Sequence, residues 1–497
     1  MLTLRRAVLA MLAGGVSVLA FAPFGAFPLA FVSLAVLVWL LERESRPRKG
    51  FLLGFAWGLG AFLLGVSWLY IALNRYGGVP APVAALAILL FCTYLAVYPA
   101  LAAALFVRLR RGGPFAHAAL FAGLWLVAEW LRGWVFTGFP WLAIGYSQTP
   151  PSPLAGYLPV IGVHGVGGLV AFASALLAFV PLRALARAGR MLAPIVLVLL
   201  LGALLGRIAW TTPSGEPLRV ALVQTNIEQG LKWEPGMLAQ WLEVNADLAA
   251  GSDAELVVLP ETTLPLLVEQ LPQGYLEHLA AGARSRDGDL IVGVFDRDAQ
   301  GRIFNAAISL GTGPAQWYAK QHLVPFGEYS PPLFGWFYSL AEIPMSDQTP
   351  GPRDQRPMRL GEQSIALNIC YEDLFGRVIR RSLPEATLLL NISNLAWYGR
   401  SLAQPQHLQI ARVRAIETGR TMLRSTNTGM TAIVHPDGSV AGVLPQFERG
   451  VLEMEVRGYQ GLTPFARWGD GTALLFALCA LALGLRRRRT DACTPAA

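Results

Sequence analysis

Three residues that together can catalyse acyl transfer each follow a short apolar run in the second half of the chain. Glu261 follows Leu-Val-Val-Leu-Pro, Lys320 follows Trp-Tyr-Ala, and Cys370 follows Ala-Leu-Asn-Ile. A carboxylate can take the proton of a thiol, and the resulting thiolate is a nucleophile. An ammonium group can stabilise the oxyanion of a tetrahedral intermediate, together with a backbone N–H such as that of Tyr371. The residue types therefore predict a base (Glu261), an electrophilic stabiliser (Lys320) and a nucleophile (Cys370).

The distribution of cysteines sets Cys370 apart. Cys92 and Cys479 fall in apolar runs and Cys493 in a basic tail, so Cys370 is the one cysteine of the long polar stretch. A free thiol is a liability in an oxidising compartment unless it is used. The competing interpretation is an inert buried cysteine, and taken singly Glu261 or Lys320 would be an ordinary loop charge. Their joint occurrence at strand ends favours a site.

The stretch that carries these residues, 211–470, has the pattern of an α/β domain, with short apolar strands alternating with amphipathic helices. Strands are expected at 218–224, 255–259, 290–295, 304–310, 316–320, 364–369, 387–392, 422–425 and 431–434, and helices at 236–250, 272–285, 373–381 and 403–418. Sites in α/β sheets gather at strand ends. The expected fold would therefore bring the three residues together.

Outside that stretch the chain is too apolar for an ordinary soluble protein. It has 497 residues, of which 54% are hydrophobic and 14% charged, and its mean hydropathy is +0.46. Runs of roughly 17–25 apolar residues can cross a hydrocarbon core about 30 Å thick. Eight spans are expected, at 6–22, 27–42, 51–73, 82–107, 116–136, 160–182, 191–210 and 471–485. We therefore predict a multi-span α-helical membrane domain over 1–210 with seven helices, an exported catalytic domain over 211–470, and an eighth helix with a basic cytoplasmic tail over 471–497.

Basic loops predict the orientation. Arg and Lys cluster at 5–6, 46–49, 108–111, 183–190 and 486–489, which are alternate loop positions. Because short basic loops are retained in the cytoplasm, both termini are expected there and the catalytic domain outside. The first span is expected to be uncleaved. This topology accounts for the net charge of +8 better than nucleic-acid binding does.

The contexts of the three residues resemble a known superfamily. Pro-Glu-Thr at Glu261, Lys-Gln-His-Leu-Val-Pro-Phe-Gly-Glu from Lys320 and Asn-Ile-Cys-Tyr-Glu-Asp around Cys370 resemble the nitrilase (carbon-nitrogen hydrolase) superfamily, whose Glu-Lys-Cys triad sits on an αββα sandwich. The resemblance extends to 391–394 and 424–429. The stretches 139–142, 145–148 and Lys232-Trp233 resemble its membrane family more narrowly, the apolipoprotein N-acyltransferases.

The resemblance implies supporting roles for four further residues. Glu328, in Pro-Phe-Gly-Glu-Tyr, matches a second essential glutamate that would orient the triad or relay protons. Tyr371 and Glu372 match the residues that follow the nucleophile, and Trp233 matches an aromatic position near the site. Leu395 departs from the Asp that relatives often carry, which puts a local loop contact in doubt.

Four residues are possible substrate contacts. Tyr146 lies in the matching stretch 145–148, and Trp397 follows the matching stretch 391–394. Glu129 and Arg132 lie three residues apart near the end of the fifth expected span. The last two can form a structural ion pair on one helix face, or contact a phospholipid head group or the exported domain. The apolar stretch 333–340 is either an arm that enters the membrane interface or a packed insertion.

Other patterns give weaker indications. His322 or His407 would be needed for a Cys-His dyad. Both are better interpreted as histidines that are hydrogen-bonded to other polar groups or exposed at the surface. The Gly-rich run 162–168 lacks the strand-turn-helix setting of a phosphate loop. No cluster has the spacing of metal ligands, and no metal or organic cofactor is expected.

The resemblance and the spans together imply a lipid substrate. The implied reaction is phospholipid-dependent N-acylation of the α-amino group of the N-terminal S-diacylglyceryl-cysteine of apolipoproteins, by a ping-pong route through a Cys370 thioester. The protein is expected in the bacterial inner membrane, with its active site in the periplasm. It is expected to be a monomer. A membrane-bound amidase or nitrilase is the enzymatic alternative, and a non-catalytic lipoprotein-handling or transport protein is the other.

Overall fold

The computed structural model describes residues 4–180, 185–331 and 347–486. It forms two compact units, of which the first comprises 1–67, 88–207 and 470–497 and the second 68–87 and 208–469. We refer to them as the helical unit and the sheet unit. The unit boundaries lie close to the expected ones at 210 and 470, except that 68–87, which was expected in the membrane domain, groups with the sheet unit.

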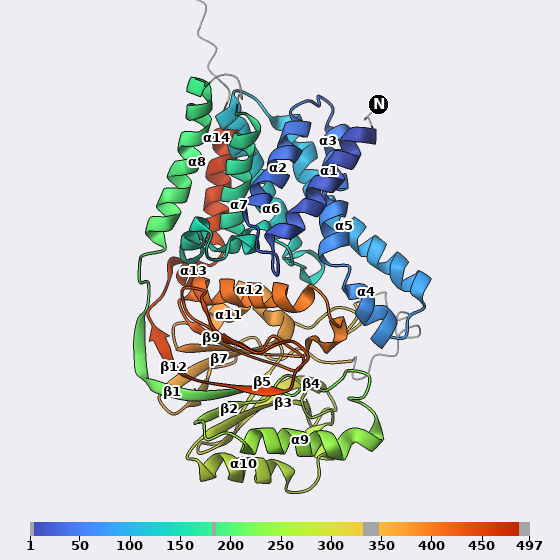
Figure 1. The fold of residues 1–497 in the computed structure, drawn as a ribbon, viewed down its shortest axis with the longest axis vertical. Coiled ribbons are helices and arrows are strands. Elements are labelled where there is room, and N and C mark those ends of the chain that lie inside the picture. Colours follow the sequence, from blue (N-terminus) through green and yellow to red (C-terminus); the bar gives the residue numbers. More distant parts are fainter. Residues whose placement is uncertain (1–3, 181–184, 332–346, 487–497) are drawn as a thin grey trace, which may run out of the picture. The chain divides into compact units, whose positions relative to one another are not determined.

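The sheet unit contains two six-stranded sheets (Figure 1). The first has the order β12-β1-β2-β3-β4-β5 and comprises β1 (Thr212–Gln224), β2 (Leu256–Val258), β3 (Asp289–Arg297), β4 (Ile303–Gly311), β5 (Gln316–Ala319) and β12 (Gly450–Gln460). The second has the order β11-β10-β9-β8-β7-β6 and comprises β6 (Met358–Leu360), β7 (Gln363–Ile369), β8 (Leu388–Ser393), β9 (Thr421–Thr426), β10 (Ala432–Val434) and β11 (Val440–Val443). Each strand expected from the sequence coincides with one of these.

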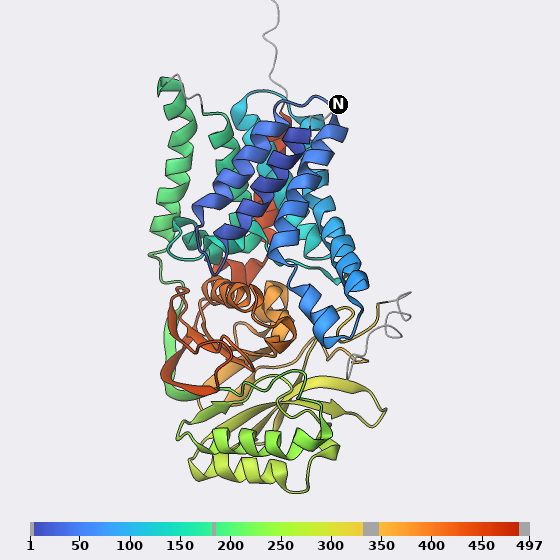
Figure 2. The same cartoon turned by 45° about the vertical axis from the view of Figure 1, so that its right-hand side comes forward.

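Four layers make up this unit, and three apolar clusters join them. The first cluster lies between the sheets and includes Val220 and Val258 from one sheet and Leu367 and Leu390 from the other. The second joins the first sheet to α9 (Leu238–Ala250) and α10 (Tyr275–Ser285), which lie side by side in Figures 1 and 2. The third joins the second sheet to α11 (Gly376–Ile379) and α12 (Ala403–Thr418). The expected α/β sandwich with outer helices is confirmed.

Parallel pairing places strand ends at common edges. β1, β2 and β3 run parallel, as do β7, β8 and β9. These strands are covered on both faces, so their sequences read as continuous apolar runs that are easily recognised. β6, β11 and β12 were not expected. β12 carries Glu453, Glu455 and Arg457 on a largely exposed edge, which hides its strand pattern.

In the described part of the helical unit, eight helices have 14 or more residues. They are α1 (Leu4–Ser17), α2 (Pro28–Leu41), α3 (Pro47–Gly65), α5 (Ala81–Leu109), α6 (Pro114–Arg132), α7 (Leu158–Ala178), α8 (Leu185–Leu205) and α14 (Gly471–Leu485). The first residues of α5 group with the sheet unit, together with α4 (Leu69–Ile71) and a π-helix at Ala72–Tyr76. α13 (Pro464–Trp468) closes the sheet unit before α14.

The expected number of eight membrane spans is not confirmed. Among the described residues, four segments are long and apolar enough to cross a membrane: Ala81–Leu109, Pro114–Arg132, Pro153–Ala178 and Ala188–Leu205. Pro47–Gly65 with Leu69–Tyr76 would be a fifth if this bent pair is one span. α1, α2 and α14 have only 14, 14 and 15 residues. At 1.5 Å per residue they reach about 21–23 Å, short of a hydrocarbon core of about 30 Å.

Small residues let α1 and α3 pack at backbone distance. A Cβ atom on Gly60 of α3 would collide with the carbonyl oxygen of Met11 of α1, and one on Gly14 would collide with the carbonyl oxygen of Trp57. Close backbone approach through small residues is a common basis of helix association in membranes. Because the colliding atoms are backbone, they cannot move without moving a helix.

We expect Gly60→Ala to destabilise the helical unit by about 1–3 kcal/mol, as overpacking does. Alanine favours helix over glycine, so the loss would reflect packing. Gly189 of α8 has no atom within 4 Å of an added Cβ, so Gly189→Ala is the matched control. Thermal unfolding in detergent measures both, and equal melting temperatures would contradict tight α1–α3 packing.

Candidate active site

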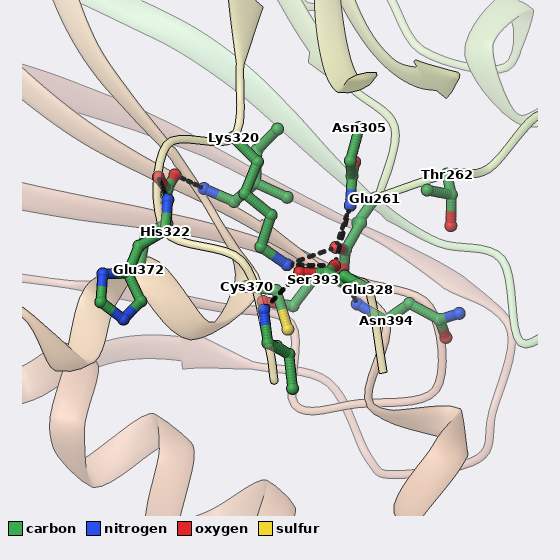
Figure 3. A network of polar contacts seen from close by, with 12 residues as sticks. Glu261, Thr262, Asn305, Lys320, His322, Glu328, Cys370, Glu372, Ser393 and Asn394 are labelled. Carbon is green, nitrogen blue, oxygen red and sulfur yellow. Dashed lines mark hydrogen bonds and ion pairs between the residues drawn. The ribbon is translucent and has the colours of Figure 1, made fainter. Parts of the chain in front are cut away.

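Glu261, Lys320 and Cys370 come from three strand ends of the sheet unit. Glu261 lies in the turn after β2, Lys320 directly after β5, and Cys370 directly after β7, at the start of a 3-10 helix, Cys370–Leu374. Figure 3 shows the three side chains converging, with the sulfur of Cys370 beside the ammonium group of Lys320. β2 and β5 belong to one sheet and β7 to the other. The site therefore exists only where the two sheets pack together.

The ammonium group of Lys320 lies between two carboxylates. Nζ donates to Glu261 Oε1 at 3.2 Å and to Glu328 Oε1 at 2.6 Å, and the Lys320 side chain is 1% exposed. Asn305 Nδ2 donates to the same two oxygens at 2.8 and 3.3 Å. The backbone N–H of Asn394 donates to Glu261 Oε2 at 2.7 Å. Glu328, proposed from the resemblance to orient the triad, thus directly contacts the lysine.

The charges keep Lys320 protonated. Burial by itself lowers the pKa of this lysine, but Glu261, Glu328 and then Cys370 raise it well above its usual value. Burial also raises the pKa of Glu328, as does repulsion from Glu261, while Lys320 opposes the shift. A cationic lysine beside a thiol is suited to stabilising an oxyanion.

The same surroundings keep the thiol of Cys370 neutral at rest. Burial raises its pKa, the charges of Glu261 and Glu328 raise it further, and Lys320 lowers it. A protonated thiol needs a base at the moment of attack. Glu261 stays the predicted base, and its carboxylate belongs to the contact network of Lys320, whose ammonium group lies beside the thiol.

Glu372 ties the loop after Cys370 to the loop after Lys320. Oε1 accepts from the backbone N–H groups of Gln321 and His322 at 2.7 and 3.1 Å. Oε2 accepts from the backbone N–H of Ile369 at 2.8 Å and from the hydroxyl of Tyr318 at 2.9 Å. Burial raises the pKa of Glu372 to about 7, against these donors. The residue thus ties the segment that precedes Cys370 to the segment that follows Lys320.

Tyr371 and Trp233 occupy aromatic surroundings of the site. The ring of Tyr371 packs on Phe375 with centroids 5.2 Å apart, and Trp233 packs on Phe295 at 5.9 Å. Trp233 is anchored by its neighbour Lys232, which is buried and donates to Thr262 Oγ1 at 2.8 Å.

Lys232 is a second amine near the site. Burial lowers its pKa to about 7, against the opposing effect of Glu261. The two residues of the Lys-Trp pair therefore make different contacts. Trp233 packs on Phe295 of β3, and Lys232 donates to Thr262, the residue that follows Glu261.

Trp397 contacts the segment 68–87 within the sheet unit. Its ring lies 6.1 Å from that of Tyr76, and neighbouring Tyr398 lies 4.6 Å from Trp68. Burial, and then the Cys370 charge, raise the pKa of Tyr398. The segment 68–87 thus supplies aromatic walls to the loop after β8, beside the nucleophile.

Glu129, Arg132 and Tyr146 belong to the helical unit. Arg132 donates to the carbonyls of Phe139 and Trp141 at 2.7 and 2.6 Å. Glu129 Oε1 accepts from the backbone N–H of Ile144 at 2.8 Å. Both charges therefore hold the loop after α6, in which Tyr146 is buried, and contact with substrate stays a prediction. The Gly-rich run 162–168 lies inside α7, and the expected arm at 333–340 lies outside the described residues.

Sequence reasoning missed Asn305 and the backbone of Asn394. Asn305 is a buried amide in the largely apolar strand β4, which was a usable signal because buried polar groups need partners. The contribution of Asn394 is a backbone N–H, which no residue type reveals. Within the described ranges, no three His, Cys, Asp or Glu side chains are grouped so as to hold a metal ion.

Comparison with known protein families shows the class of protein to which the chain belongs. Residues 219–462 match the family model described as carbon-nitrogen hydrolase, and residues 13–176 match that of the apolipoprotein N-acyltransferase N-terminal domain. The sheet unit is therefore a carbon-nitrogen hydrolase domain. The whole chain belongs to the apolipoprotein N-acyltransferase family.

Full-length relatives support this assignment. The chain is 45% identical over 482 residues to apolipoprotein N-acyltransferase of Nitrosomonas europaea, covering 96% of each chain. It is 45% identical over 491 residues to that of Chromobacterium violaceum, covering 96% of this chain and 94% of the relative. Among solved structures, a cysteine-to-alanine mutant of the Nesterenkonia AN1 amidase from the nitrilase superfamily has 20% identity and a TM-score of 0.38, covering 53% of this chain and 95% of the amidase.

The charges around Cys370 predict opposite effects of two substitutions on its alkylation. Glu261→Gln removes a charge that raises the thiol pKa, so the midpoint of the pH profile of alkylation by iodoacetamide should move to lower pH. Lys320→Met removes a charge that lowers the pKa, so the midpoint should move to higher pH. Peptide mass spectrometry of Cys370 over a pH series measures both.

The exposed Glu385 provides the control, and Glu385→Gln should leave the alkylation profile unchanged. Shifts of Glu261→Gln and Lys320→Met in the same direction would contradict the electrostatic account of the thiol.

Proposed function

We propose that this chain transfers an acyl group from a phospholipid to the α-amino group of the S-diacylglyceryl-cysteine at the N-terminus of an apolipoprotein. The observation that carries the proposal is the cationic Lys320 held between Glu261 and Glu328 beside Cys370. It occurs in a chain that matches the acyltransferase family over both of its units. The Glu-Lys-Cys arrangement supports acyl chemistry, and the membrane helices support a lipid donor.

The first half-reaction would load Cys370. Glu261 takes the S–H proton as the sulfur attacks the ester carbonyl carbon of the phospholipid. The resulting oxyanion is stabilised by the Lys320 ammonium and by the backbone N–H of Tyr371. Collapse breaks the bond to the glycerol oxygen, which takes the proton from Glu261 and leaves as lysophospholipid. Cys370 then carries a thioester.

The second half-reaction would unload it. The α-amino group of the acceptor attacks the thioester carbonyl, and Glu261 accepts a proton from the nitrogen. Collapse of the tetrahedral intermediate expels the sulfur of Cys370, which recovers its proton from Glu261. Because a thioester is less stable than an amide, transfer needs chiefly that water be excluded from the intermediate.

The proposal includes a location and an assembly state. We place the chain in the bacterial inner membrane as a monomer, with the sheet unit in the periplasm and both termini in the cytoplasm. The support is the alternation of basic loops along the sequence. Phospholipid and diacylated apolipoprotein are the two partners.

The proposal predicts a trapped acyl group on Cys370. Purified protein in detergent is incubated with dioleoyl phosphatidylethanolamine, and peptides are examined by mass spectrometry for an oleoyl thioester. We expect the adduct on wild type and its absence on Cys370→Ala. Adding a synthetic S-diacylglyceryl-cysteine peptide should discharge it with formation of the N-acyl peptide. An enzyme that hydrolyses small amides but never carries the oleoyl group would instead be a membrane-bound amidase.

Lys320→Met should slow formation of this thioester by about 10²- to 10³-fold, as expected for loss of one oxyanion donor. The substitution leaves Glu261 and Glu328 facing each other, so we pair it with Lys320→Met/Glu328→Gln, which removes one of the two charges. The double variant should fold, as judged by thermal unfolding, and remain slow. Near wild-type acylation by either variant would remove Lys320 from the mechanism.

A further inference from the structure

Cys370 has a backbone conformation that residues with a side chain rarely adopt. Its φ is +54°, in the left-handed region that costs about 1–2 kcal/mol. Such a conformation persists where the surroundings hold it. Asn391 Nδ2 donates to the carbonyl oxygen of Cys370 at 3.1 Å, and His407 also hydrogen-bonds to the Cys370 backbone. Two side chains outside the candidate triad thus hold the nucleophile.

These two side chains belong to a buried polar cluster drawn from four elements. Asp373 follows Cys370 in its 3-10 helix, His407 lies on α12, Asn391 on β8 and Arg424 on β9, and none is more than 1% exposed. His407 Nε2 lies 2.6 Å from Asp373 Oδ1, and its Nδ1 lies 2.6 Å from Arg424 Nη2. Arg424 Nη1 donates to Asp373 Oδ2 at 3.3 Å and to Asn391 Oδ1 at 3.1 Å.

The partners fix the tautomer of His407. A guanidinium group can only donate, so Nδ1 must accept from Arg424 and cannot carry a proton. The proton of the neutral ring is then on Nε2, where it faces Asp373 and the Cys370 backbone. Burial, and then the charge of Arg424, lower the pKa of His407, which favours this neutral form.

The same assignment excludes a Cys-His dyad that uses His407. The lone pair of Nδ1 is used by Arg424, and Nε2 already carries a proton. His407 therefore has no free site with which to accept the proton of the thiol. What it can supply is a fixed donor to the backbone of the nucleophile.

We propose that His407, held between Asp373 and Arg424, is a positioning residue that fixes the left-handed backbone of Cys370 and so aims its sulfur at the substrate carbonyl. The inference rests on the proposed acyl transfer through Cys370. A displacement of about 1 Å in a reacting group can cost about 10²-fold in rate, so a loosened nucleophile should be slow.

The test compares two substitutions of His407 in the single-turnover acylation of Cys370 by dioleoyl phosphatidylethanolamine. Glutamine can donate from Nε2 and accept at Oε1, so His407→Gln should retain a rate constant within about tenfold of wild type. Leucine has neither group, so His407→Leu should lower the rate constant by about 10²-fold. The dependence of the rate on phospholipid concentration should be unchanged in both. His435→Leu, at an exposed position, is the control.

The rate constant of acylation distinguishes a positioning role of His407 from a role in stability alone. Partial unfolding lowers the amplitude of acylation but leaves the rate constant of the folded molecules unchanged. If His407→Leu acylates at the wild-type rate with reduced amplitude, His407 is structural and the inference is wrong. Should that variant fail to fold, His407→Asn is used, because it can still meet Arg424 but is too short to reach Cys370, and a wild-type rate there would overturn the inference too. Failure of the wild-type chain to acylate would instead overturn the proposed function and the inference with it.

Discussion

The structure of the site depends on a buried ammonium ion and the groups that neutralise it. Removing an ammonium group from water costs several kcal/mol unless it is paired and hydrogen-bonded. Lys320 meets this requirement with Glu261 and Glu328, and Asn305 satisfies both carboxylates in turn. These residues come from the ends or interiors of different elements of one sheet, and the N–H of Asn394 joins them to the other. The groups that neutralise Lys320 thus also connect the two sheets at the site.

Cys370, the proposed nucleophile, depends on this arrangement in two ways. The carboxylates that keep Lys320 charged also raise the pKa of Cys370, so that the thiol is protected from ionisation until a base acts. The second way is geometric, because Glu372 fixes the loops after β5 and β7 to each other. Asp373 continues the same short helix into the His407 cluster. A single turn of chain therefore couples the electrostatics of the site to the backbone of its nucleophile.

The division of the chain into two units is close to that of the two family models that the chain matches. A carbon-nitrogen hydrolase domain accounts for the chemistry, while the family assignment rests on both units. The segment 68–87 departs from this simple division. It follows α3 in sequence and includes the first residues of α5, yet Trp68 and Tyr76 pack within the sheet unit on the loop after β8. Part of the membrane region of the sequence thus builds the surroundings of the site.

The sequence by itself determined the strands that are buried on both faces, because such strands read as continuous apolar runs, and it identified Glu261, Lys320 and Cys370 by type and context. It did not reveal β12, because charged residues on this edge strand hide the strand pattern. It also did not give the number of membrane helices, because a hydropathy profile does not show at which residue a helix ends. Only the tertiary structure decided that Asn305 joins both glutamates and that Arg424 sets the tautomer of His407. These are contacts between residues distant in sequence, and their geometry follows from how strands and helices pack on each sheet.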